Sequence, residues 1–88
     1  MTVGSTAQPY ELSFRDKVAA TVRAQLAYRR VSQSELARLL HVPAGYVSRR
    51  LTGEVALDVD DLERIAKALN VAVDVLLPRL DSNQKPAG

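Results

Sequence analysis

A short stretch of the chain joins small residues to two arginines, a pattern typical of surfaces that bind nucleic acid. The stretch is AGYVSRRLT, residues 44–52. Arg49 and Arg50 can each pair with a guanine through two hydrogen bonds or bind a phosphate. Ala44 and Gly45 have almost no side chain, so the backbone there can come close to base edges. These residue types favour a helix that enters the DNA major groove, which is about 12 Å wide.

The sequence offers little for catalysis or metal binding. It has one histidine and no cysteine, too few for a cluster of the usual metal ligands. Its four glycines form no phosphate-binding loop, and no Gly-x-Ser-x-Gly elbow is present. We therefore expect no enzyme activity, no cofactor, no metal and no small-molecule ligand.

Length and composition favour one small domain. The chain has 88 residues, of which 47% are hydrophobic and 5% aromatic, so its core should be mainly aliphatic. Residues 1–57 carry a net charge of +4 and residues 58–88 carry −2. One face would then attract an anion, although a mixed solvated surface explains the same charges. No stretch approaches the ~20 apolar residues of a membrane span, and no secretory signal opens the chain, so we expect a cytoplasmic protein.

Capping signals predict an all-α domain of five short helices at residues 13–78, between flexible tails at 1–12 and 79–88. Four helices would start at or near the capping residues Ser13, Ser32, Pro43 and Asp58. Gly53 and Asn70 are the expected left-handed stops of the third and fourth helices. The fifth helix is expected at residues 71–77, before Pro78.

Apolar spacing predicts which side of each helix is buried. The expected core positions are Phe14, Val18, Val22 and Leu26 in the first helix, Leu36, Ala37 and Leu40 in the second, Val47 and Leu51 in the third, Leu62, Ile65, Ala66 and Leu69 in the fourth, and Val71, Val73, Leu76 and Leu77 in the fifth.

The second and third helices are separated by only three residues, His41 to Pro43. Two helices joined by so short a turn cross at a steep angle. The outer side of the third helix would then project from the body. The residues expected on that outer side are Ala44, Gly45, Tyr46, Ser48, Arg49 and Thr52.

These segments together resemble the lambda-repressor-like, or Cro/repressor-type, helix-turn-helix domain of phage repressors and bacterial regulators. The likeness lies in SQSELARLL for the second helix, YVSRRLTGE for the recognition helix, and LERIAKALNVAVDVLL for the closing helices. It covers residues 32–77, about half of the chain. Each segment alone is common, but the three in this order and spacing are specific. The resemblance implies a compact five-helix bundle, double-stranded DNA as partner, and work in the cytoplasm or nucleoid of a bacterial host.

The resemblance also assigns roles to single positions. Base-reading positions of the family match Ala44, Gly45, Ser48 and Arg49, and we add Tyr46 as a further candidate. Gln33 matches a position that contacts the DNA backbone, and Thr52 lies near another. Arg50 would pack its stem and reach a phosphate with its head. Arg30 and Arg38 are either backbone contacts or solubilising charges, and Arg23 is expected to be solvated.

Two functions remain open at this stage. The first is a sequence-specific transcriptional regulator, most simply a repressor of the Cro-like phage or prophage type that occupies an operator. Such operators have two-fold symmetry, so we expect a homodimer on DNA, with Val73, Leu76, Leu77 and Leu80 as candidate contacts. The second is a protein-interaction module, such as an antitoxin or accessory subunit, in which the helix-turn-helix is a scaffold and residues 73–80 dock a partner.

Overall fold

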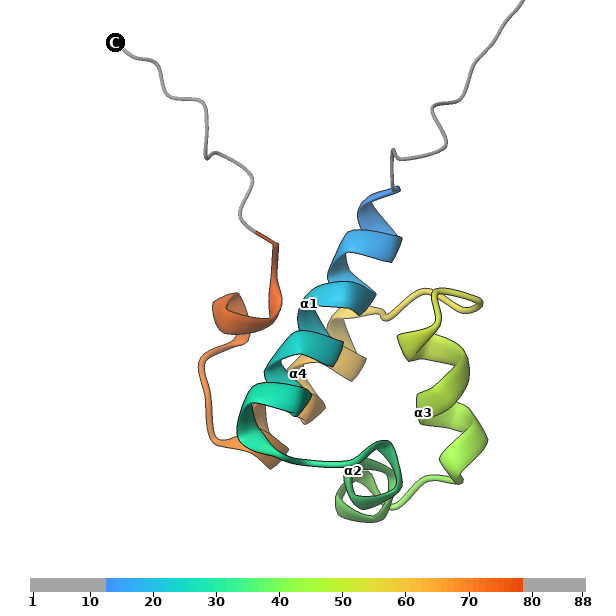
Figure 1. Cartoon of the computed structure of the whole chain (residues 1–88), viewed down its shortest axis with the longest axis vertical. Helices are drawn as coiled ribbons and strands as arrows, with labels where there is room; N and C mark the ends of the chain where they lie inside the picture. Colours follow the sequence, from blue (N-terminus) through green and yellow to red (C-terminus); the bar gives the residue numbers. More distant parts are fainter. Residues whose placement is uncertain (1–12, 79–88) are drawn as a thin grey trace, which may run out of the picture.

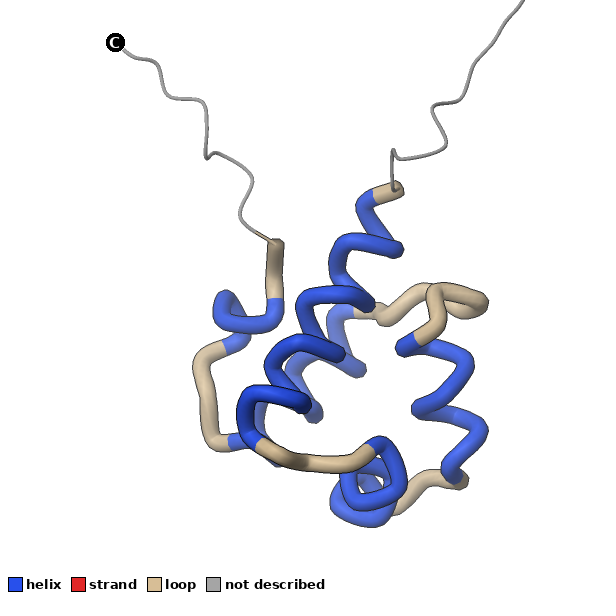
Figure 2. Tube along the Cα trace, in the orientation of Figure 1, coloured by secondary structure: helices blue, strands red, loops and turns tan. Residues whose placement is uncertain are grey.

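The computed structural model describes residues 13–78, and all regular structure in that range is helical (Figures 1 and 2). The elements in order are α1 (Phe14–Arg29), α2 (Gln33–Leu40), α3 (Ala44–Leu51), α4 (Val59–Leu69) and the 3-10 helix η2 (Val73–Leu76). Within residues 13–78 the predicted all-α class is confirmed, with four α-helices and not five. The predicted tails at 1–12 and 79–88 lie outside the described residues. No helix in the described range is long and apolar enough to cross a membrane.

The segment predicted as a fifth helix forms only one short turn, η2. Its N-terminal flank, Ala72, has an extended backbone and supplies no side-chain cap. Leu77 is extended again immediately after the turn. With no cap and with Pro78 following, the segment has too little local stabilisation to extend into an α-helix.

The predicted helix starts agree with the structure. The Ser13 hydroxyl accepts a hydrogen bond from the Asp16 N–H at 3.2 Å, and the Ser32 hydroxyl accepts one from the Glu35 N–H at 3.0 Å. Pro43 flanks α3 and gives it no side-chain cap, as its chemistry requires. Each of the two serine caps stabilises its helix by about 1 kcal/mol.

Three helices end in left-handed residues that satisfy their last carbonyls. Arg30, His41 and Asn70 have φ of 60°, 61° and 59°, and Gly53 in the loop after α3 has φ of 89°. The prediction was right for Gly53 and Asn70. The left-handed Arg30 has no signal in the sequence, because neither glycine nor asparagine marks that helix end.

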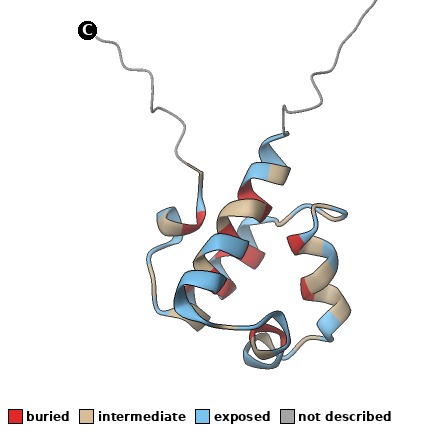
Figure 3. Cartoon of the chain, in the orientation of Figure 1, coloured by how far each residue is buried: buried red, intermediate tan, exposed pale blue. Residues whose placement is uncertain are grey.

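A small aliphatic core joins the four helices and η2 (Figure 3). α2 packs on α3 and α4, while α1 packs on α3 and η2. The buried members of the core are Val18, Val22, Leu26, Leu36, Ala37, Val47, Leu51, Leu62, Ile65, Ala66 and Leu76. Leu40, Leu69 and Val71 are half-buried at its edge.

Three predicted core positions are wrong. Phe14, Val73 and Leu77 have exposed fractions of 54%, 38% and 37%. Phe14 is the first residue of α1, and this end of the helix projects beyond the elements it covers (Figure 1). Val73 and Leu77 are exposed because the single turn of η2 directs only Leu76 inward.

Two arginines outside the helix-turn-helix bind the carbonyl ends of its two helices. Arg23 of α1 donates a hydrogen bond from Nη1 to the carbonyl of Leu51, at the end of α3. Arg64 of α4 donates from Nη2 to the carbonyl of Leu40, at the end of α2, at 3.3 Å. The last carbonyls of a helix lack partners and carry partial negative charge, so a guanidinium there is favourable. Arg23, expected to be solvated, therefore helps to fix α3 on α1.

Gly53 provides a test of how the loop after α3 packs against α1. A Cβ there would lie 2.4 Å from Oδ1 of Asp16, and the positive φ is unfavourable for any other L-residue. We expect Gly53→Ala to lower the free energy of unfolding by about 1–2 kcal/mol in urea denaturation. Gly45→Ala is the matched control, because a Cβ at Gly45 meets only the end of the Arg49 side chain. The control should be neutral or slightly stabilising, and equal losses in both variants would contradict the argument.

Candidate nucleic-acid interface

The turn between α2 and α3 is held by backbone hydrogen bonds. The N–H of His41 donates to the carbonyl of Arg38 at 3.2 Å, and that of Val42 donates to Ala37 at 3.0 Å. The left-handed His41 then redirects the chain, and α3 begins after Pro43. Ala37 is 3% exposed, and its small side chain lets α2 approach the helices packed against it closely. The predicted helix-turn-helix is therefore present.

The phase of α3 decides which of its residues face outward. An α-helix advances by about 100° per residue, so the side opposite the buried Val47 and Leu51 is centred on Arg49, with Gly45 beside it and Thr52 and Tyr46 about 60° to either side. Arg49 and Thr52 are exposed, and Gly45 is half-buried. Ser48, half-buried, lies on one flank of this outer side, and Ala44 is exposed as the first residue of the helix. Tyr46 and Arg50 lie on the other flank.

The Arg49 side chain lies beside Gly45 on the outer side of α3. A Cβ at Gly45 would lie 3.1 Å from Nη1 of Arg49. The Arg49 guanidinium thus lies one turn back, over the space that Gly45 leaves open. The absence of a side chain at position 45 therefore allows a charged group to lie near the front of the helix.

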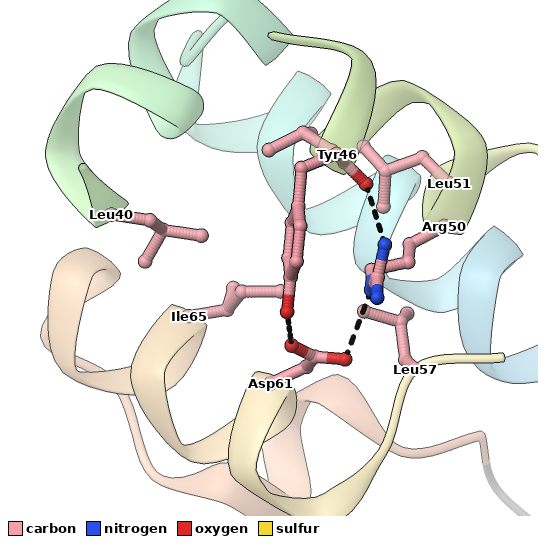
Figure 4. A pocket seen from close by; sticks show the side chains of 8 residues that line it. Leu40, Tyr46, Arg50, Leu51, Leu57, Asp61 and Ile65 are labelled. Carbon is pink, nitrogen blue, oxygen red and sulfur yellow. Dashed lines mark hydrogen bonds and ion pairs between the residues drawn. The ribbon is translucent and has the colours of Figure 1, made fainter. Parts of the chain in front are cut away.

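Tyr46 does not take the outward position that the sequence predicted, and the head of Arg50, which was predicted to reach a phosphate, is bound within the domain. Their side chains point to Asp61 of α4, a carboxylate that is 3% exposed (Figure 4). The Tyr46 hydroxyl donates to Oδ1 of Asp61 at 2.5 Å, and Nε of Arg50 lies 3.2 Å from Oδ2. Both side chains are held against the body because a buried carboxylate needs charged or hydrogen-bonding partners.

Arg50 is held by further contacts. Its Nη1 donates to the carbonyl of Tyr46 at 3.2 Å, and its guanidinium stacks 3.5 Å from the centre of the Tyr46 ring. The Arg50 side chain is only 18% exposed. A phosphate contact by Arg50 would first require these bonds to break. We name Tyr46, Arg50 and Asp61 the Asp61 cluster.

Hydrogen bonds set the protonation of the Asp61 cluster. Burial alone would raise the pKa of Asp61, but bonds from the Tyr46 hydroxyl, the Asp58 N–H and Arg50 together hold that pKa below its usual value. The same bond to the carboxylate, helped by burial, raises the pKa of Tyr46. Asp61 is therefore ionised and Tyr46 protonated at neutral pH.

The predicted DNA-backbone residues Gln33, Arg30 and Arg38 lie on α2 or at the helix end that precedes it. Gln33 is the first residue of α2 and is exposed. Arg30 is exposed at the end of α1. Arg38 is exposed and lies 3.7 Å from Glu35 on the same helix, in a weak surface ion pair. These side chains remain accessible to a ligand that approaches the α2–α3 side.

Only two of the residues predicted as dimer contacts are accessible within residues 13–78. Leu76 is 0% exposed and belongs to the core, so its assignment as a contact is wrong. It is buried because it supplies the inward side chain of η2. Val73 and Leu77 are partly exposed, and Leu80 lies outside the described residues.

Sequence reasoning missed three structural residues: Asp61, Arg23 and Arg64. Asp61 also takes part in the cap of α4, where it accepts a bond from the Asp58 N–H at 3.1 Å. A spacing of four between Tyr46 and Arg50, beside the buried Val47 and Leu51, is the one signal that could have indicated a polar partner. Within residues 13–78 no group of acidic or histidine side chains could hold a metal.

Comparison with known proteins places these features in a family. A model for a helix-turn-helix family, HTH_3, matches residues 26–76. A search of curated proteins returns no significant match. Among solved structures, the chain is similar to the clp gene regulator ClgR from C. glutamicum, with 31% identity and a TM-score of 0.69. The alignment covers 75% of this chain and 87% of that one.

The Asp61 cluster gives a stability prediction. We expect Asp61→Asn to lower the free energy of unfolding by about 2 kcal/mol at neutral pH, because Arg50 loses its buried counter-charge. Asp60→Asn removes the same charge from an exposed neighbour in the same helix turn, and should change stability by less than about 0.5 kcal/mol. Urea denaturation of both variants beside the wild type measures the difference.

The pH dependence of stability follows from the pKa shifts of Asp61 and Tyr46. Because folding lowers the pKa of Asp61, its contribution is full above the usual carboxyl range and is lost as pH falls through the lowered pKa. Because folding raises the pKa of Tyr46, stability is also lost as pH rises above about 10. The free energies of unfolding of the wild type and Asp61→Asn should therefore converge in acid. A constant difference between the two free energies down to about pH 2 would show that Asp61 acts without its charge.

Proposed function

The chain belongs to the Cro/C1-type helix-turn-helix family, and from this premise we propose that it is a sequence-specific DNA-binding transcriptional regulator. In this proposal α3 (residues 44–51) enters the major groove and α2 lies across its edge. The single observation that carries it is the outer side of α3, where Arg49 is exposed and lies over Gly45.

Arg49 is the principal base-reading residue in this proposal. Its guanidinium has five donors and no bond to an acidic side chain within the described residues, so it is free to pair with guanine O6 and N7. Ala44, Gly45 and Ser48 contribute close approach, a methyl contact and one hydroxyl. Specificity would therefore rest on few side chains.

The DNA backbone would be bound around this helix. Gln33 at the start of α2 lies where free backbone N–H groups favour a phosphate. Arg30, Arg38 and Thr52 are exposed near the ends of α1, α2 and α3, and complete the proposed set. Tyr46 and Arg50 are proposed to act indirectly, since their bonds to Asp61 set the position of α3 on α4.

Repression by occupancy of an operator is the simplest action for such a domain. The similar solved protein is itself called a gene regulator, which supports a role in transcription. We further propose a compact repressor of the phage or prophage type, acting on DNA in the bacterial nucleoid. One eight-residue helix reads only a few base pairs, so two copies on a two-fold operator are expected.

Salt dependence separates this proposal from the protein-interaction module. If the protein binds DNA, log Kd for a short duplex should rise linearly with log salt, with a slope near the number of phosphates neutralised. Fluorescence anisotropy with a labelled duplex measures the slope. Absence of binding at low salt would favour the scaffold function, in which the partner is a protein.

Arg49 provides the sharper test, once selection from random duplexes has supplied the preferred site. We expect Arg49→Ala to weaken binding to that site by about 1–3 kcal/mol and to change binding to unrelated DNA little. Arg38→Ala should weaken both equally and lower the salt slope by about one. Lys17→Ala removes an exposed positive charge from α1 that is not among the proposed DNA-binding residues, and serves as the control.

Uniform weakening by Arg49→Ala across all sequences would mean that Arg49 binds phosphate. In that case specificity would have to come from other residues of α3 or from DNA shape.

A further inference from the structure

A shallow hollow lined by apolar and basic side chains lies where the end of α2 meets the second half of α4. It has a volume of about 340 Å³ and is lined by Leu39, Leu40, His41, Arg64, Lys67 and Ala68. None of these residues is acidic, and none belongs to the set proposed to bind DNA. The volume is at the lower end of the range of ligand pockets, about 300–1,000 Å³, so the hollow suits one or two side chains of a partner.

One part of the lining is apolar. Leu39 is 40% exposed, and Leu40 and Ala68 are half-buried. Leu39 and Leu40 come from α2 and Ala68 comes from α4, so folding brings them together. A partner side chain that covered Leu39 would remove apolar surface from water, which favours association.

The other part of the lining carries two cations. Arg64 donates from Nη2 to the carbonyl of Leu40 at 3.3 Å, and its Nη1 lies 3.9 Å from Oδ1 of Asp61. These contacts fix a guanidinium whose side chain is still 44% exposed. Lys67 is exposed and forms no ion pair with another residue in the range 13–78. One fixed and one unpaired cation therefore lie beside an exposed leucine.

This combination selects a partner that is both acidic and apolar. The phosphates of a nucleic acid would attract Arg64 and Lys67 but would gain nothing from Leu39 and Ala68. A peptide with an apolar side chain between carboxylates satisfies both parts of the lining. The chain's own ends do not supply such a segment, because residues 1–12 hold one acidic side chain and residues 79–88 hold one acidic and two basic ones.

A second copy of the chain is a poorer occupant than a separate protein. The acidic side chains at the start of α4, such as Asp60 and Glu63, are exposed and would be the part that reaches the hollow. That contact joins two different surfaces, so it would repeat head to tail from copy to copy. A separate acidic protein occupies the hollow without this consequence.

We propose that this hollow docks an acidic segment of another protein. One apolar side chain of the segment lies against Leu39, and its carboxylates pair with Arg64 and Lys67. The contact goes beyond DNA binding and does not depend on it. Since no proposed DNA-binding residue lines the hollow, the two partners do not compete for the same side chains.

Titration of the isotope-labelled full chain with a synthetic peptide tests the site. The probe is the peptide DELLED, which has two leucines between acidic pairs. DESSED lacks the apolar side chains, and KRLLRK reverses the charge. We expect DELLED to shift the amide NMR signals of residues 39–41 and 64–68 and to leave those of residues 44–51 in place. DELLED should bind about fivefold more tightly than DESSED, because only its leucines can cover Leu39, and KRLLRK should not bind.

Variants at the hollow separate its two parts. Lys67→Glu should weaken DELLED about three- to tenfold, because a weak surface attraction becomes a repulsion. Lys17→Glu is the matched control, since it makes the same change at an exposed residue of α1 outside the hollow, and should leave the affinity almost unchanged. Leu39→Ser should remove the preference for DELLED over DESSED. The amide spectrum of each variant shows whether it is folded.

Several results would overturn the proposal. They are unshifted signals of the hollow at about 1 mM DELLED, shifts confined to α3, equal affinities for DELLED and DESSED, or equal losses in Lys67→Glu and Lys17→Glu. If Lys67→Glu weakened DNA binding more than Lys17→Glu does, the hollow would belong to the DNA interface instead. If the free protein formed head-to-tail chains that Lys67→Glu abolished, the occupant would be a second copy. A failure of DNA binding would leave the peptide results standing, so the two proposals fail separately.

Discussion

The position of α3 depends on one buried carboxylate. Asp61 is 3% exposed, and it joins the start of α4 to two side chains of α3. A charged carboxylate at such a site is costly unless it is paired and hydrogen-bonded, so the sequence must supply its partners. Tyr46, Arg50 and the Asp58 N–H supply them, and Arg64 adds a more distant charge at 3.9 Å. An alternative docking of α3 would deprive this charge of its two partners on that helix, which makes the observed docking strongly preferred.

The same constraint divides α3 into functional sides. Val47 and Leu51 enter the core, Tyr46 and Arg50 satisfy Asp61, and Gly45, Arg49 and Thr52 remain for a ligand. Adjacent arginines with the same chemistry thus have opposite roles: Arg50 has a buried counter-charge and Arg49 has none in the described residues. A helix of eight residues can hold both roles because successive side chains are about 100° apart.

What the sequence predicted well is what depends on neighbours along the chain. Caps at Ser13, Ser32 and Asp58, the left-handed Asn70 and the buried stripes of the helices follow from spacings of three and four residues. The outer side of α3 was correct only where it lay opposite Val47 and Leu51. Tyr46 and Arg50 lie on a flank, and whether a flank is exposed depends on where α4 packs. That position is set by contacts across 11 to 15 residues of sequence, which no local pattern contains.

The arginine contacts show why so small a domain can keep its two helices rigid. Arg23 and Arg64 each bind the carbonyl end of a helix to which they are not adjacent in sequence, with separations of 28 and 24 residues. A helix end has partial negative charge and unsatisfied carbonyls, so these bonds stabilise a particular packing and not merely a helix. Arg23 fixes the end of α3, Arg64 fixes the end of α2, and Asp61 holds α3 along its flank, while the front of α3 remains uncovered. The fold can therefore present Arg49 on a fixed helix without using the Arg49 side chain for its own stability.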